Sequence, residues 1–179
     1  MVSRRSLGLV GVLGGAPTGD FICEPDELWQ LDLKGPFTVQ GKKWYFLICI
    51  DDYSRCIVAA QQFNNCPSIE EILAGIQPAI DFRKPENILT DNNPFKEGWA
   101  ELLAKQGIKA CFAHPYYPQD KGKVERTIRN LAEEFVNLLL KFPHWLAGKL
   151  SEWVNWFNNQ RYHRGINGYP ANLYGELRS

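Results

Sequence analysis

The order of strand-like and helix-like segments limits the possible folds of this chain more than any other feature. Three β-rich runs come first, at residues 28–39, 43–50 and 56–63. After them, helical periodicity alternates with two short strands, at residues 87–90 and 108–112. Consecutive strands suit an antiparallel meander, whereas strands separated by helices join a sheet through crossovers. The pattern therefore predicts an α/β protein with a five-stranded mixed sheet and helices on both faces.

Several local signals refine this prediction. Gly35-Pro36 interrupts the first strand, which indicates a bulge or kink. The turn residues 51–54 connect the second and third strands as a hairpin. Ser68 is followed three residues later by Glu71, the spacing of a capping box at the start of a helix. Pro78 lies inside the same helical pattern and is expected to kink or divide it.

Bulk composition points to one globular domain. The chain has 179 residues, and 45% of them are hydrophobic. The 20 basic and 20 acidic residues balance, which argues against a protein that coats nucleic acid along its whole surface. We predict an irregular N-terminal segment or linker over residues 1–25 and a single folded domain over 26–179.

The cysteines and the N-terminus bear on location. The five cysteines have irregular spacing and no C-x-x-C pair, which favours free thiols in a reducing, cytoplasmic compartment. No run approaches the roughly 20 apolar residues of a membrane span. Ser3-Arg4-Arg5 faintly resembles a twin-arginine export signal, but glycines interrupt the apolar stretch that follows it. We therefore favour a linker over an export signal, and no membrane association.

Three carboxylates are the strongest functional candidates. Asp32 lies within the first strand, Asp91 ends the fourth, and Glu125 lies in the first turn of an amphipathic helix. Two acids on strands and one on a helix can converge at one point, and hard divalent cations prefer such oxygen ligands. Each acid also has a purely structural explanation. Asp32 would lie on the solvated face of an edge strand, Asp91 would stabilise a turn or helix cap, and Glu125 would pair with Arg129.

Longer motifs surround these acids and resemble a known family. Trp29-Gln-Leu-Asp32, Leu89-Thr-Asp91-Asn92 and the segment from His114 to Glu125 resemble the catalytic core of the retroviral-integrase and transposase superfamily. The three acids match its Asp, Asp, Glu triad one for one. The final segment, residues 156–170, is similar to the tail of insertion-sequence transposase cores. The resemblance covers about residues 26–174 and implies a ribonuclease-H-like fold, with residues 26–179 forming an integrase-like catalytic core.

The resemblance also implies a mechanism. Asp32 would bridge two Mg²⁺ or Mn²⁺ ions, with Asp91 on one ion and Glu125 on the other, and the site would cleave a DNA end and join it to target DNA. The implied partners are donor DNA ends, target DNA and further copies of the chain in a homodimer or larger assembly. Polar side chains near Glu125 would contact DNA phosphates. These are Gln119, Lys121, Lys123, Arg126 and Arg129.

One departure from the family pattern keeps two other functions open. Asn93 stands where the family usually has glycine, and Phe95 comes one residue early. A displaced Asp91 would suit a non-catalytic DNA-binding or assembly module derived from a transposase. A ribonuclease-H-like nuclease that only hydrolyses would use the same three acids. A strand-joining assay separates these alternatives.

Overall fold

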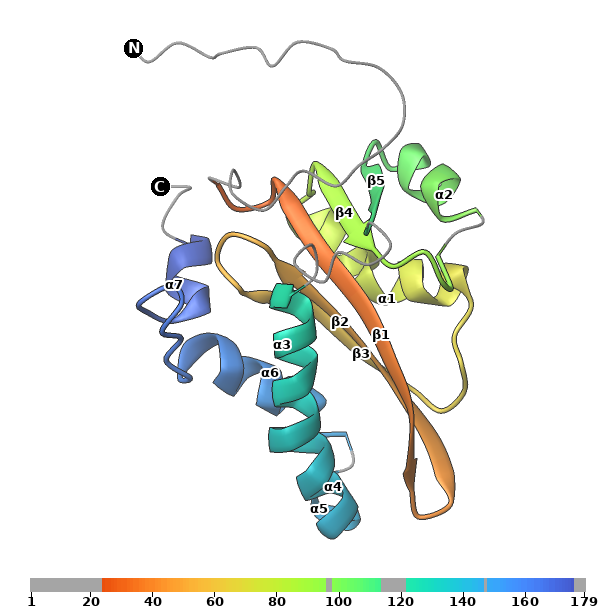
Figure 1. The fold of residues 1–179 in the computed structure, drawn as a ribbon, viewed down its shortest axis with the longest axis vertical. Coiled ribbons are helices and arrows are strands. Elements are labelled where there is room, and N and C mark those ends of the chain that lie inside the picture. The colour runs from red at the N-terminus through yellow and green to blue at the C-terminus, as the bar shows by residue number, and fades with distance from the viewer. Residues whose placement is uncertain (1–23, 96–97, 114–121, 147, 176–179) are drawn as a thin grey trace.

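The computed structural model describes residues 24–95, 98–113, 122–146 and 148–175 (Figure 1). The predicted N-terminal segment therefore lies almost entirely outside the described residues, and its division from the folded domain stays a prediction. Within the described part of the chain, no helix has both the length and the apolar character needed to cross a bilayer.

A five-stranded mixed sheet forms the centre of the fold, in the strand order β3-β2-β1-β4-β5. The first three strands pair antiparallel, while β4 pairs parallel with β1 and β5 pairs parallel with β4. The predicted sheet is confirmed. The strands are β1 (Leu28–Val39), β2 (Lys42–Asp51), β3 (Ile57–Phe63), β4 (Asn87–Thr90) and β5 (Lys109–Phe112).

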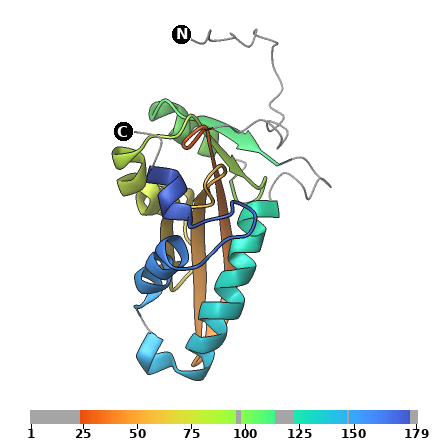
Figure 2. The ribbon, with the colours of Figure 1, turned by 90° about the vertical axis from the view of Figure 1, so that its left-hand side faces the viewer.

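Alternating side chains of β2 fill two separate cores. Phe46 and Ile48 pack on one face with α3 (Gly122–Asn130) and α6 (Leu150–Asn159), together with the residues that continue α3. Leu47 and Cys49 point to the other face, because successive strand residues face opposite ways. There they meet α1 (Ile69–Phe82) and α2 (Trp99–Lys105). Figures 1 and 2 show α3 and α1 on opposite sides of the sheet, so the predicted helices on both faces are confirmed.

The predicted bulge, hairpin and capping box are confirmed. The register between β1 and β2 shifts between Lys34 and Phe37, and β2 and β3 form an antiparallel pair. At the start of α1, Ser68 Oγ accepts from Glu71 N at 3.2 Å. In return, Glu71 Oε2 accepts from Ser68 N at 2.8 Å.

Two helices differ from the sequence-based expectation. Pro78 does not divide α1, which continues unbroken from Ile69 to Phe82, so the expected division is wrong, while the alternative of a kink stays a prediction. Pro78 lies on the exposed side of α1 while Ile76 and Ile80 anchor its other side in the core. The helix that begins at Gly122 includes an unpredicted π-helical stretch, Leu131–Val136, before α4 (Asn137–Lys141). Two further short helices are α5 (Pro143–Leu146), which comes after α4, and α7 (Pro170–Gly175), which comes after α6.

Candidate active site

The first two candidate carboxylates lie just beyond the paired residues of two neighbouring parallel strands, Asp32 within β1 and Asp91 directly after β4. Gln30 on β1 is in register with Leu89 on β4, so two further residues along each strand bring Asp32 level with Asp91. This is the carboxyl end of the parallel pair, the edge at which open α/β sheets bind ligands. Because β1 is flanked by β2 and β4, the explanation of Asp32 as part of an edge strand is wrong. Asp32 and Asp91 are both half-buried.

Glu125 is brought to the same strand by its neighbour in the sequence. Val124 N, in the first turn of α3, donates a hydrogen bond to Gln30 Oε1 at 3.1 Å. Gln30 lies two residues before Asp32 and therefore shares its face of the sheet. Glu125 itself is exposed. Among the described residues it forms no ion pair with Arg129, so the simple structural explanation of Glu125 is not supported.

The Gln30 side chain is itself held by a buried acid. Gln30 Nε2 donates to Asp52 Oδ1 at 2.6 Å, and both residues are 2% exposed. Asp52 Oδ2 forms an ion pair with Lys123, the residue next to Val124. Two contacts therefore fasten the first turn of α3 to β1 and to the end of β2. We call these residues, Gln30, Asp52, Lys123 and Val124, the helix clamp.

The acid beside the helix clamp, Asp51, is fully buried and supports the turn after β2. Asp51 Oδ2 accepts from Ser54 N at 2.7 Å and from Ser54 Oγ at 2.6 Å, while Asp51 Oδ1 accepts from Asp26 N at 2.8 Å. Burial raises the pKa of the Asp51 carboxyl above its usual value, and the hydrogen bonds from Ser54 and Asp26 oppose that rise. Asp51 is therefore a structural acid that keeps Asp52 in place.

The donor chemistry of the three carboxylates fits a hard divalent cation. All three offer oxygen atoms only, which suits Mg²⁺ or Mn²⁺ and not a thiolate-seeking metal. The strand register brings Asp32 level with Asp91 at the carboxyl end of the β1–β4 pair. The helix clamp holds the first turn of α3, which carries Glu125, against β1. In the described residues, however, no three histidine, cysteine, aspartate or glutamate side chains lie close enough to hold an ion together.

The predicted DNA-contacting residues have different outcomes. Gln119 and Lys121 lie outside the described residues. Arg126 and Arg129 are exposed on α3, and contact with DNA stays a prediction for both. Lys123 is already paired with Asp52, and its side chain is 29% exposed, so its first role in this structure is to anchor α3.

Sequence reasoning missed the helix clamp and an arginine. The sequence pattern assigns Asp52 only to a turn and gives no role to the Gln30 side chain. The signal for Asp52 was a second acid directly after a buried strand, beside Asp51. Arg55, which lines a cavity together with Arg161 and Arg164, was also missed.

The fold defines a class of protein. A chain of the simian T-cell lymphotropic virus intasome, solved with PP2A regulatory subunit B56 gamma, has a TM-score of 0.77 at 20% identity, covering 94% of this chain and 62% of that one. The HTLV-2 integrase catalytic core domain, solved with magnesium, has a TM-score of 0.68 at 19% identity, covering 84% of this chain and 97% of that one. The fold is thus ribonuclease-H-like, as predicted.

Sequence comparison then identifies the family. Residues 23–118 match a family model described as an integrase core domain, and residues 106–170 match a second model of that description. The first match alone spans more than half of the chain, which therefore belongs to the integrase core domain family. The Gag-Pol polyprotein of avian reticuloendotheliosis virus is 29% identical over 127 residues, 65% of this chain. The chain spans only 10% of that polyprotein's length.

Proposed function

We propose that this chain is the catalytic core of an integrase or transposase that cleaves DNA ends and joins them to target DNA. One observation carries the proposal. Asp32 lies on β1 and Asp91 directly follows β4, each two residues beyond the paired Gln30 and Leu89, and the first turn of α3, which carries Glu125, is hydrogen-bonded to β1. Membership of the integrase core domain family agrees with this assignment.

In this proposal Asp32, Asp91 and Glu125 hold two Mg²⁺ or Mn²⁺ ions. When bound, such ions activate the attacking oxygen and stabilise the leaving oxygen in a displacement at phosphorus. Asp32 and Asp91 supply ligands from rigid strands, which need little reorganisation to receive a cation. Three neighbouring carboxylates repel one another when ionised, so cation binding also relieves their mutual repulsion.

The helix clamp positions the third ligand. Gln30 Oε1 accepts the Val124 N–H, while Gln30 Nε2 is held by Asp52. These bonds set where α3 begins against β1, and hence where Glu125 lies relative to Asp32. Gln30 and Asp52 are in this account positioning residues that act through α3.

A non-catalytic DNA-binding or assembly module is the second candidate. The observation that favours it is the lack of a three-ligand cluster among the described residues. If the loop after Asp91 keeps its carboxylate away from Asp32 and Glu125, the chain would keep the fold but could not hold the metal ions needed for catalysis. A nuclease that only hydrolyses would use the same acids and differs in its products.

A gel assay with short DNA duplexes separates the three functions. We expect wild-type protein with Mg²⁺ or Mn²⁺ to yield strand-joined products, and Asp91→Asn to yield none. Cleaved but unjoined DNA would assign a nuclease. No product from wild-type protein, or product unchanged by Asp91→Asn, would overturn the catalytic proposal.

We also infer that the chain works as a homodimer or larger assembly with DNA. The HTLV-2 integrase core has been solved in dimeric and trimeric forms. This chain exposes large apolar side chains near the end of α4, with Leu140 at 48% and Phe142 at 53% exposure, surfaces that self-association would cover. The four described cysteines are free thiols, and a reducing, cytoplasmic location stays a prediction.

A further inference from the structure

A basic cavity lies beside α3, on a flank that does not carry Glu125. Its volume is about 510 Å³, and it lies between α3, which lines it from Gly122 to Asn130, and the segment that follows α6. Gly122, Arg126 and Asn130 recur at i, i+4 and i+8 along the cavity, so they form one stripe of the helix. Glu125 and Arg129 do not line it.

The lining is strongly cationic and contains no carboxylate. Five lining residues carry a permanent or near-permanent positive charge: Arg55, Lys123, Arg126, Arg161 and Arg164. Two carboxylates outside the lining offset part of this charge. Asp52 pairs with Lys123 and lies 3.8 Å from Arg55, while Glu134 Oε1 accepts two hydrogen bonds from Arg161.

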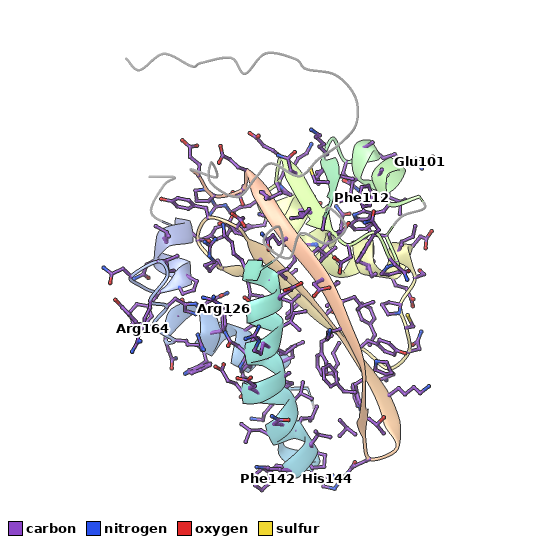
Figure 3. The ribbon with its side chains drawn as sticks, in the orientation of Figure 1. Glu101, Phe112, Arg126, Phe142, His144 and Arg164 are labelled. Carbon is purple, nitrogen blue, oxygen red and sulfur yellow. The ribbon has the colours of Figure 1, made fainter. Side chains whose placement is uncertain are left out.

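Two arginines of the lining pair with no carboxylate in the part of the chain that the structure describes. Neither Arg126 nor Arg164 forms an ion pair with any residue that the structure describes. Both are exposed, and Figure 3 shows them on the same side of the molecule, one on α3 and one on the segment after α6. Five cations against two carboxylates leave an uncompensated positive charge in this concave surface.

Two buried nitrogens on the lining residues also lack a hydrogen-bond partner in the described part of the chain, Arg55 Nη1 and His163 Nε2. Burial lowers the pKa of Arg55, and the nearby Arg126 charge lowers it further, while Asp52 and Asp51 oppose the change. Burial, and then the Arg161 charge, lower the pKa of His163 to about 4, so this ring is neutral at pH 7. An anion in the cavity would offset the repulsion between cations.

We propose that this cavity binds a phosphate group, at a site separate from the three carboxylates. Guanidinium groups present paired N–H donors that match phosphate oxygens, and four of the five cations here are arginines. A cavity of this size exceeds one phosphate and is open to longer ligands. The phosphate could belong to a nucleic-acid backbone following α3 or to a free phosphate compound, and the two sources are separable by experiment.

The first experiment titrates inorganic phosphate into metal-free protein and follows binding by calorimetry or NMR. We expect the double variant Arg126→Gln, Arg164→Gln to weaken phosphate binding about tenfold or more, because each substitution removes one charge-assisted hydrogen bond to the phosphate. Lys141→Gln is the matched control: it removes an exposed charge at the far end of α4, away from the cavity, and should bind as wild type. Equal affinity of the double variant and wild type would overturn the proposal, as would an equal loss in Lys141→Gln.

The second experiment repeats the comparison with a short DNA duplex at several salt concentrations. If the phosphate belongs to DNA, the double variant should lower the slope of log affinity against log salt by about two, one for each lost phosphate contact. An unchanged slope together with weakened inorganic phosphate binding would assign the cavity to a free phosphate compound. Asp32→Asn should bind phosphate normally, so loss of catalysis and loss of this cavity are distinguishable.

Discussion

At the scale of single residues, Gln30 connects β1 both to the buried Asp52 carboxylate and to the start of α3. Its one amide group satisfies the buried Asp52 carboxylate and the Val124 N–H at the start of α3. Buried polar groups cost free energy when left without partners, so Gln30 serves both stability and position. A residue of similar size without the amide would lose both hydrogen bonds and retain the packing.

We therefore expect Gln30→Leu to lower the free energy of unfolding by about 1–3 kcal/mol, because Asp52 and Val124 lose a buried partner. A loss of position should in addition raise the Mg²⁺ concentration that gives half-maximal DNA joining. Denaturant unfolding and a Mg²⁺ titration of activity measure the two effects. Gln61→Leu, at an exposed site on β3, is the control and should change neither by much. A stability loss with an unchanged Mg²⁺ requirement would contradict the positioning role.

At the scale of elements, α1 shows how tertiary packing overrides a local signal. Pro78 lacks an N–H and disfavours a helix interior, yet α1 continues through it. Ile72, Ile76 and Ile80 bury one side of α1 against the sheet, and the capping box stabilises its first turn. The gain from burying these side chains exceeds the local cost of the proline.

Replacing the proline should reveal that cost. We expect Pro78→Ala to raise the free energy of unfolding by about 1–2 kcal/mol, since the restored helix hydrogen bond outweighs the greater freedom of the unfolded chain. Ser68→Ala, at the N-cap of the same helix, should lower the free energy of unfolding by about 1 kcal/mol because the capping hydrogen bond is lost. Chemical denaturation measures both, and a less stable Pro78→Ala would show that the proline suits the helix geometry.

The helices and strands were largely predictable from the sequence. Which distant strands pair, and which distant side chains meet, was less predictable. The alternation in β2 and the spacing of Ser68 and Glu71 identify a strand and a helix start because both depend on nearby residues. The central position of β1 depends on which distant strands pair with it, and periodicity does not contain that information. Likewise, Gln30 and Asp52 are 22 residues apart, so their hydrogen bond could not be read from local spacing.

At the scale of the whole molecule, a buried polar cluster connects the two ends of the described fold. Asp26 Oδ2 accepts from Arg83 Nε at 2.8 Å, and Asp26 Oδ1 accepts from Tyr174 Oη at 2.7 Å. Arg83 also donates to the Tyr174 carbonyl and lies 3.8 Å from the centre of its ring. Burial and the Asp26 hydrogen bond raise the pKa of Tyr174, which keeps the hydroxyl protonated as a donor.

Loss of that hydroxyl should loosen the C-terminal helix. We expect Tyr174→Phe to lower the free energy of unfolding by about 1 kcal/mol and to speed hydrogen exchange at α7 amides first. Tyr169→Phe is the control, because its hydroxyl has no hydrogen bond among the described residues and its ring is kept. If exchange at α7 is equal in both variants, the cluster does not hold the C-terminal end.

The central claim is that Asp32, Asp91 and Glu125 together bind divalent cations at the edge of the sheet. Anomalous diffraction from crystals soaked in Mn²⁺ tests it most directly. We predict Mn²⁺ density between the Asp32 and Asp91 carboxylates, with Glu125 among the ligands, and its loss in Asp91→Asn. Mn²⁺ bound elsewhere, or absent from this edge in protein that still joins DNA in solution, would contradict the claim.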